Sequence, residues 1–142
     1  IDLAHIDFFA DLNSKNPNKF NSAGVVNEKW FKFQPKPSWY FLYTLKAILS
    51  DYKFDSELDS GVETINIYKF ENPETATCIY AVWCATSSGK EVQNHTFTVD
   101  GKEASLMQLS SSVTTPETSV LPINDSKVSV NLSETPVFIK VW

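Results

Sequence analysis

At 142 residues, the chain is long enough for one domain, or for one domain together with a piece of another. Its 42% hydrophobic and 20% charged residues are typical of a globular protein with a buried core, and they exclude a disordered chain. The net charge of −5, with twelve scattered lysines and no arginine, argues against nucleic acid as a partner because no guanidinium group is present to clamp phosphate or guanine.

No apolar run approaches the roughly 18–20 residues of a membrane span, so we expect no membrane-spanning segment. The chain starts at Ile1 and not at methionine, and we expect an upstream segment to have been removed by processing, proteolysis or cloning. Cys78 and Cys84 lie in one predicted strand, roughly 20 Å apart along the extended chain. A disulfide needs less than about 7 Å, so we expect two free buried thiols, no metal site and no cofactor.

The segment before residue 34 is mixed in character. Residues 6–12 form a short apolar run that predicts one buried strand ending in polar residues. Residues 15–24 are dense in Asn, Pro, Ser and Gly, which predicts a loop. Residues 25–33, "VVNEKWFKF", predict a short extended piece.

A helix is predicted to begin at Pro37, because a first helical position needs no backbone N–H donor. The helix has two apolar stripes, one of Trp39, Leu42, Tyr43, Leu45 and Leu49, and a second of Phe41, Ile48 and Tyr52. A helix on a protein surface usually has a single apolar stripe. We therefore expect this helix to be packed between two layers of the structure.

From residue 62 onward the sequence is all-β. Seven strands are predicted, at 62–70, 76–86, 91–99, 104–109, 118–123, 127–132 and 136–142. The "CIYAVWCA" strand is apolar on both faces and is expected to be central, while Asp100-Gly101 predicts a two-residue hairpin turn. The expected fold class is mainly β, an antiparallel β-sandwich (62–142) preceded by a strand–loop–helix piece (1–54) and a linker (55–61).

The segments "SAGVVN" and "KPSWYFLYTLKAILSDYKF", followed by a sandwich with "YAVW" and "LSETPVFIKV", resemble the C-terminal part of a retaining TIM-barrel glycoside hydrolase. The resemblance implies that residues 1–54 are the last barrel strand and helix. It also implies that both catalytic glutamates lie outside this chain, so that the chain is not an enzyme by itself. A poly- or oligosaccharide would be the partner through the parent enzyme, and a secreted, periplasmic or cell-surface location would follow.

Three residues are candidates for substrate binding. Asp11 and Asn13 would stand at the C-terminal end of the proposed barrel strand, the rim where barrel active sites are built. They would alternatively be a polar cap on a buried strand. Trp30, like Trp142, is little constrained by its neighbours and could stack on a sugar or pack against another domain, whereas Trp39 and Trp83 are expected in the core.

Two classes of function are compatible with this pattern. The first is an accessory region of a glycoside hydrolase, which packs on the catalytic barrel and is not catalytic alone. The second is a stand-alone carbohydrate-binding or adhesion module. A structural domain without a ligand is a third, plainer option. If the chain is a truncated barrel, its N-terminal segment would expose apolar surface and self-associate through residues such as Ile6, Phe8, Phe9, Val25 and Val26.

Overall fold

The computed structural model describes residues 9–12 and 23–142. The elements are η1 (Lys29–Phe31), α1 (Pro37–Leu49), β1 (Lys53–Leu58), β2 (Ile65–Glu71), β3 (Cys78–Cys84), β4 (Val92–Thr98), β5 (Ala104–Gln108), β6 (Glu117–Leu121), β7 (Lys127–Leu132) and β8 (Val137–Val141). The prediction of a mainly β chain with antiparallel sheets is confirmed, and each of the seven predicted strands is present. Within the described ranges, no helix is long and apolar enough to cross a membrane.

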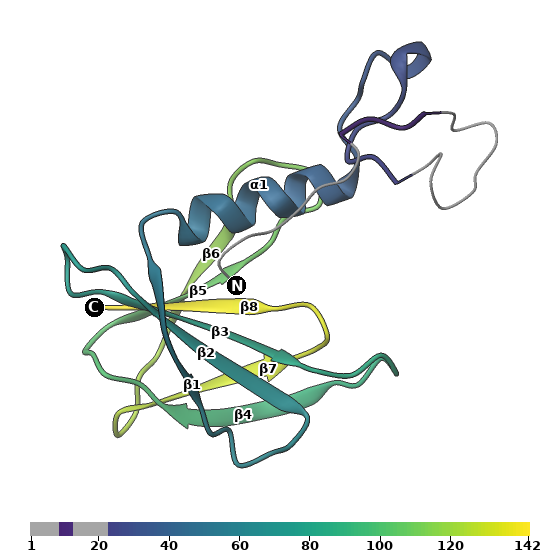
Figure 1. The fold of residues 1–142 in the computed structure, drawn as a ribbon. Coiled ribbons are helices and arrows are strands. Elements are labelled where there is room, and N and C mark those ends of the chain that lie inside the picture. Colours follow the sequence, from purple (N-terminus) through teal and green to yellow (C-terminus); the bar gives the residue numbers. More distant parts are fainter. Residues whose placement is uncertain (1–8, 13–22) are drawn as a thin grey trace.

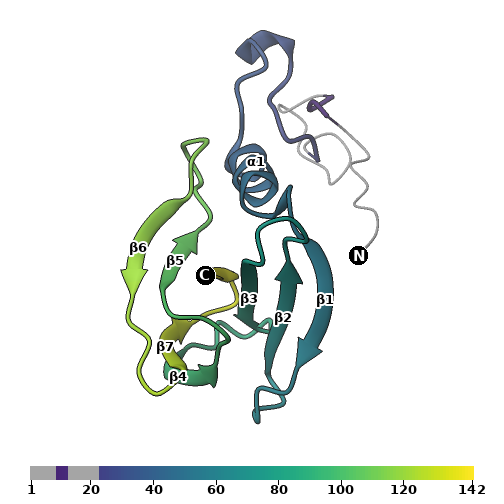
Figure 2. The ribbon, with the colours of Figure 1, turned by 90° about the vertical axis from the view of Figure 1, so that its left-hand side faces the viewer.

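The strands form two sheets. Six strands pair in the order β1-β2-β3-β8-β5-β6, and β4 pairs with β7 in a separate two-stranded sheet. All these ladders are antiparallel. In Figure 2 α1 is seen nearly end on above the middle of the large sheet, whereas β4 and β7 lie below it. The chain therefore builds three layers, with the six-stranded sheet in the middle.

The central position of β3 follows from its sequence, which is apolar on both faces. Tyr80 and Val82 point toward the small sheet and join the larger core, which is built mainly from alternate residues of β2, β3, β4, β7 and β8. Ile79 and Ala81 point the other way and form a second core with α1. A strand covered on both faces must have apolar residues at successive positions, which is the pattern observed.

One face of α1 packs on the six-stranded sheet. Ile48 is buried against Met107 and Phe138, and Leu45, Leu49 and Tyr52 pack beside it. Burying one such large apolar side chain stabilises the fold by roughly 1.5–3 kcal/mol. The contact face combines members of both predicted stripes. The opposite side of the helix, with Trp39, Leu42 and Tyr43, is exposed or half-buried in this chain.

Strand β1 was absent from the sequence prediction. Residues 55–58, part of the expected linker, belong to this strand, which pairs with β2 at the edge of the sheet. Its side chains are exposed or half-buried, so no apolar alternation indicated a strand. The ladder register also shifts between Phe54 and Ser56, which is a β-bulge of the kind common at sheet edges.

The predicted hairpin at Asp100-Gly101 is wrong. β4 and β5 do not pair with each other, because the chain crosses here from the small sheet to the large one. Gly101 has another role, since a Cβ atom at this position would lie 2.2 Å from Val141 Cγ1. The glycine is required by close packing against the end of β8, and it does not adopt the positive φ of a tight hairpin turn.

The described residues before α1, 9–12 and 23–36, project beyond the N-terminal end of the helix (Figure 1) and are called the N-terminal segment below. Of the predicted strand at 6–12, only 9–12 are described, and Ala10 forms a single parallel bridge with Val26. Residues 25–33 are not extended throughout, because they include the 3-10 turn η1. Val25 and Val26 are buried within the segment, contrary to the expectation that they would be exposed, whereas Phe9 is 65% exposed.

Candidate functional site

The carboxylate of Asp11 lies at the centre of a small polar network in the N-terminal segment. Asp11 is buried, and its Oδ1 accepts hydrogen bonds from the Gly24 N–H at 3.0 Å and the Lys36 ammonium at 2.6 Å. Lys36 Nζ also donates to the Gly24 carbonyl oxygen at 2.9 Å. Three stretches of chain are thus joined by one carboxylate and one ammonium, and such charge-assisted bonds are the stronger kind in proteins.

Gly24 is required by the close approach of two backbones. A Cβ atom at residue 24 would lie 2.3 Å from the Ala10 carbonyl carbon and 2.4 Å from the Asp11 nitrogen. The Val25 and Val26 N–H groups both donate to the Phe9 carbonyl oxygen at 3.0 Å. The absence of a side chain at residue 24 is therefore what lets Asp11 reach its partners.

Trp30 lies at the tip of a turn that the rest of the segment holds in place. It is 86% exposed, and Phe31 and Phe33 beside it are also exposed. The Asn27 N–H donates to the Gln34 carbonyl oxygen at 2.9 Å and closes the base of the turn. Such a turn presents aromatic faces to solvent, which is what stacking on a sugar ring or packing against another protein surface requires.

The turn also holds two residues in the left-handed backbone region. Lys32 and Phe33 have φ of 56° and 54°. Such a backbone is uncommon for side chains other than Gly, Asn and Asp, and it costs of order 1 kcal/mol or more for each residue. Lys32 is the residue that ends η1, so the chain changes direction directly after Trp30 and Phe31.

The structure brings together only part of the predicted substrate-binding set. Asp11 is in place, but its Oδ1 is used by Gly24 and Lys36. Asn13 lies outside the described residues. Trp30 is available to a ligand. Gly24 and Lys36 were missed as partners of Asp11, although the "KP" before the helix and the lone glycine of "SAGVV" were sequence signals for them.

The remaining tryptophans have different environments. Trp83 packs edge-on against Tyr68 with ring centroids 4.9 Å apart, as part of the core beneath α1. Trp39 was expected in the core, but it is half-buried on the outer side of α1, where it stacks on Tyr43. Trp142 is 48% exposed and donates from Nε1 to Glu103 Oε2 at 3.1 Å. None of these three is presented as openly as Trp30.

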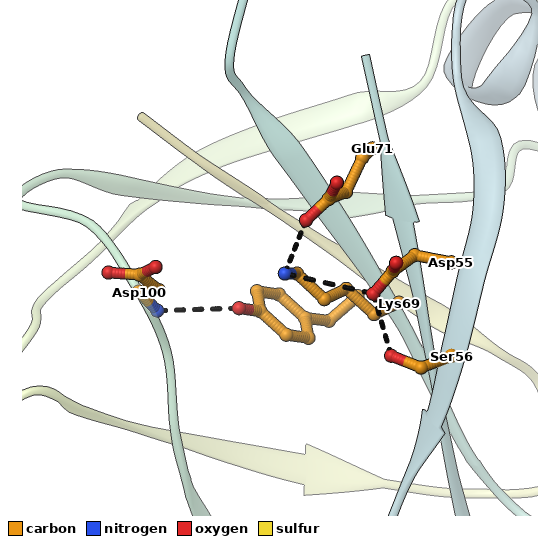
Figure 3. A network of polar contacts seen from close by, with 6 residues as sticks. Asp55, Ser56, Lys69, Glu71 and Asp100 are labelled. Carbon is orange, nitrogen blue, oxygen red and sulfur yellow. Dashed lines mark hydrogen bonds and ion pairs between the residues drawn. The ribbon is translucent and has the colours of Figure 1, made fainter. Parts of the chain in front are cut away.

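A second polar network lies at the β1–β2 edge of the sandwich (Figure 3). The Lys69 ammonium contacts Glu71 at 2.5 Å and Asp55 at 3.8 Å. The hydrogen bond that Lys69 donates to Glu71 is the main reason why the pKa of Lys69 is raised. Close by, the Asp100 N–H donates to the Tyr80 hydroxyl, and burial raises the pKa of Tyr80 to about 12. The Lys69–Asp55 contact joins β2 to β1, and the Asp100–Tyr80 bond joins the connection after β4 to β3, so these contacts have the character of a structural network.

In the part of the chain that the structure describes, no three His, Cys, Asp or Glu side chains gather in a group that could hold a metal ion. Cys78 and Cys84 are both free and buried, as the spacing predicted. Burial raises the pKa of the Cys78 thiol. A raised pKa favours the thiol over the thiolate, so Cys78 is a poor nucleophile.

Comparison with known proteins finds similarity among solved structures. No family model and no curated protein matches the sequence. Among solved structures, the chain is similar to the catalytic domain of GH30 xylanase C from Talaromyces cellulolyticus, with a TM-score of 0.57 and 19% identity. The fold is shared with part of a glycoside hydrolase domain. The match covers 85% of this chain but only 27% of the xylanase chain, so this chain spans about a quarter of that domain.

Proposed function

We propose that this chain is a C-terminal accessory region of a glycoside hydrolase, in which residues 1–54 complete a TIM barrel and the sandwich braces it. The observation that carries the proposal is the two-sided character of α1. One side is buried on the six-stranded sheet, and the other carries the exposed Leu42 and Tyr43 and the half-buried Trp39. A second layer packed on that exposed side would explain why it is apolar.

Two further features support this proposal. The bridge between Ala10 and Val26 is parallel, whereas every named strand pair is antiparallel. Parallel pairing is the rule in TIM barrels, where each strand is followed by a helix, and α1 follows this bridge. The likeness to the GH30 xylanase domain over 85% of this chain is compatible with a region of a glycoside hydrolase.

In this proposal the chain is not catalytic alone. Retaining hydrolysis requires two carboxyl groups roughly 5 Å apart across the scissile bond. Asp11, which would lie at the barrel rim, accepts hydrogen bonds from Gly24 and Lys36. It would hold the loop that presents Trp30, while both catalytic glutamates would come from the rest of the barrel.

The test is to express the complete gene product and to assay it on aryl glycosides and on xylan, glucan and mannan. Cleavage by the complete protein, with none by residues 1–142, is the expected result. A Trp30→Ala variant of the complete protein should raise KM for a polysaccharide more than for an aryl glycoside, because stacking on a distant sugar ring is lost. If the complete protein has no glycosidase activity and binds no glycan, the proposal is wrong.

The alternative is a stand-alone carbohydrate-binding or adhesion module. The observation in its favour is the 86% exposure of Trp30 next to two exposed phenylalanines. This alternative requires the chain alone to bind a polysaccharide through that turn. Calorimetry of residues 1–142 and of its Trp30→Ala variant distinguishes it from the accessory role. Binding that Trp30→Ala abolishes, together with an inactive complete protein, would favour the module.

A further inference from the structure

A polar groove of about 430 Å³ lies at one end of the sandwich. Its walls come from the start of β4, the end of β5 with the following loop, the start of β6, and the turn between β7 and β8. Most lining side chains are amides, hydroxyls or carboxylates, and the lining includes no lysine or histidine. A volume of this size falls within the range of small-ligand sites.

Two walls of the groove are held in place by local hydrogen bonds. Ser110 Oγ accepts from the Ser112 and Val113 N–H groups at 3.2 and 3.0 Å, which fixes the loop after β5. In the β7–β8 turn, Ser133 Oγ accepts from the Thr135 N–H at 3.1 Å. Walls that are rigid before binding lower the entropy cost of capturing a ligand.

On the β4–β7 side, the wall is a bulge. Asn131 Oδ1 accepts from the Asn94 N–H at 3.0 Å, where the register shifts between Val92 and His95. This bond uses the amide oxygen of Asn131, so its NH₂ group is the donor that remains for a ligand. The side chain of Asn131 is thus oriented before any ligand arrives.

Two glutamine side chains of the groove have unused hydrogen-bonding groups. Gln93 on β4 and Gln108 on β5 are exposed, and neither side-chain amide makes a hydrogen bond within the described ranges of the chain. Each amide offers one acceptor and two donors. A ligand with neighbouring hydroxyl groups can use both functions of one amide at once.

The charges of the groove restrict the ligand further. Glu91 and Glu117 line it, no cation lines it, and the whole chain carries a net charge of −5. An anionic ligand would meet like charges from both side chains. Carboxylates accept hydrogen bonds from hydroxyl donors. A neutral ligand with several hydroxyl groups can therefore donate to these carboxylates without electrostatic repulsion.

We propose that this groove, which shares no residue with the Trp30 turn, is a binding site for a neutral oligosaccharide. The choice of a sugar over other polyols rests on the function proposed above. Apolar strips from Leu109 and Pro136 lie among the polar groups, and they suit the C–H faces of sugar rings. The groove would thus hold a neutral chain and reject one that carries uronic acids.

The test uses residues 1–142 with ¹⁵N labelling, titrated with xylo-, cello- and manno-oligosaccharides, with oligogalacturonate and with sorbitol. One of the neutral oligosaccharides should shift amide resonances at 91–93, 108–112 and 131–137, while oligogalacturonate and sorbitol should bind at least about tenfold more weakly. In the Gln93→Ala, Gln108→Ala double variant the dissociation constant should rise about tenfold, as expected for the loss of two or more hydrogen bonds. Thr98→Ala, an exposed change on β4 outside the groove, is the matched control and should leave binding unchanged.

Three results would overturn the inference: no neutral oligosaccharide shifts these resonances at millimolar concentration, the shifts occur elsewhere, or oligogalacturonate binds as tightly as the neutral chains. Equal binding of sorbitol would overturn the assignment of a sugar as the ligand. The titration involves no hydrolysis. If the complete protein is active but the titration shows no binding, the groove proposal alone is wrong. If the groove binds an oligosaccharide but the complete protein is inactive, only the proposed accessory role is wrong.

Discussion

The Thr44 hydroxyl on α1 connects the helix to the loop after β5 through Ser110. Thr44 is fully buried, its Oγ1 donates to the Tyr40 carbonyl oxygen at 2.8 Å, and it accepts from the Ser110 N–H at 3.4 Å. Ser110 in turn caps its own loop. A single polar atom in an apolar contact thus links the helix to a loop that lines the groove.

Replacing Thr44 by Val keeps the shape of the side chain but removes both hydrogen bonds. The buried Ser110 N–H would lose its partner, and an unsatisfied buried donor costs about 1–3 kcal/mol. We expect the free energy of unfolding to fall by about 1–2 kcal/mol in urea denaturation, because the long 3.4 Å bond is a weak one. Thr98→Val on the exposed face of β4 is the control, and an equal loss in both variants would refute the role of Thr44.

The sheet was predictable from the sequence because its signal is local. β7 alternates buried and exposed residues along "KVSVNL", and β3 is apolar throughout, so each strand's own residues indicate its place. β1 has no such signal, because an edge strand with exposed side chains needs no apolar face. Its existence depends on pairing with β2, the next strand of the chain, and not on its own side chains.

Contacts between distant segments were not predictable. The apolar stripes of α1 were visible in the sequence, but which of their residues contact the sheet depends on the orientation of the helix. In the structure Trp39 is only half-buried, whereas the polar Thr44 is fully buried. The hairpin prediction at Asp100-Gly101 failed for a related reason. The dipeptide predicts a tight turn, whereas tertiary packing against Val141 required a glycine there. Likewise, the partners of Asp11 are Gly24, which lies 13 positions along the chain, and Lys36, which lies 25 positions along it.

Gly24→Ala should disrupt the N-terminal segment and leave the sandwich folded. The added methyl group would lie 2.3 Å from the Ala10 backbone, which must move, and Asp11 would then lose the Gly24 N–H and the Lys36 ammonium. Hydrogen exchange should become at least about tenfold faster at residues 24–36 and stay unchanged in β3 and β8. Gln34→Ala, at an exposed side chain of the same segment, should change neither. Unaltered exchange in Gly24→Ala would show that the close approach is not required.

His95 should make the stability of the sandwich depend on pH. Its side chain is buried on β4, its Nε2 has no hydrogen-bond partner, and it stacks on Phe97. Burial lowers its pKa below the usual 6.5, so the folded protein favours the neutral imidazole. As the pH falls below about 6.5, His95 binds a proton in the unfolded chain but not yet in the folded protein. The free energy of unfolding therefore decreases until the pH reaches the lower pKa of His95 in the folded protein.

The loss through His95 is at most about 1.4 kcal/mol for each pH unit in that window. Urea denaturation at pH 7.5, 6.5 and 5.5 measures it, and His95→Leu should have a flatter pH profile with similar stability at pH 7.5. The difference between the two proteins isolates His95, because acidic groups titrate in both. Parallel pH profiles would mean that His95 is not the responsible group.

The exposed side of α1 should make the isolated chain associate with itself. Leu42 and Tyr43 are 39% and 48% exposed, and Trp39 stacks on Tyr43 beside them. Adjacent apolar side chains of this size favour burial against another surface. We expect light scattering to detect a dimer of residues 1–142 at high micromolar concentration.

The Leu42→Lys, Tyr43→Lys double variant should raise the dissociation constant of this dimer at least about tenfold, because charged groups would then face the interface. Both changes reduce the negative net charge, so charge repulsion between chains cannot explain that result. Val120→Lys, at a side chain 89% exposed on β6, is the matched control and should leave the dimer intact. A chain that stays monomeric at the highest concentration reached would show that this side of α1 does not drive association.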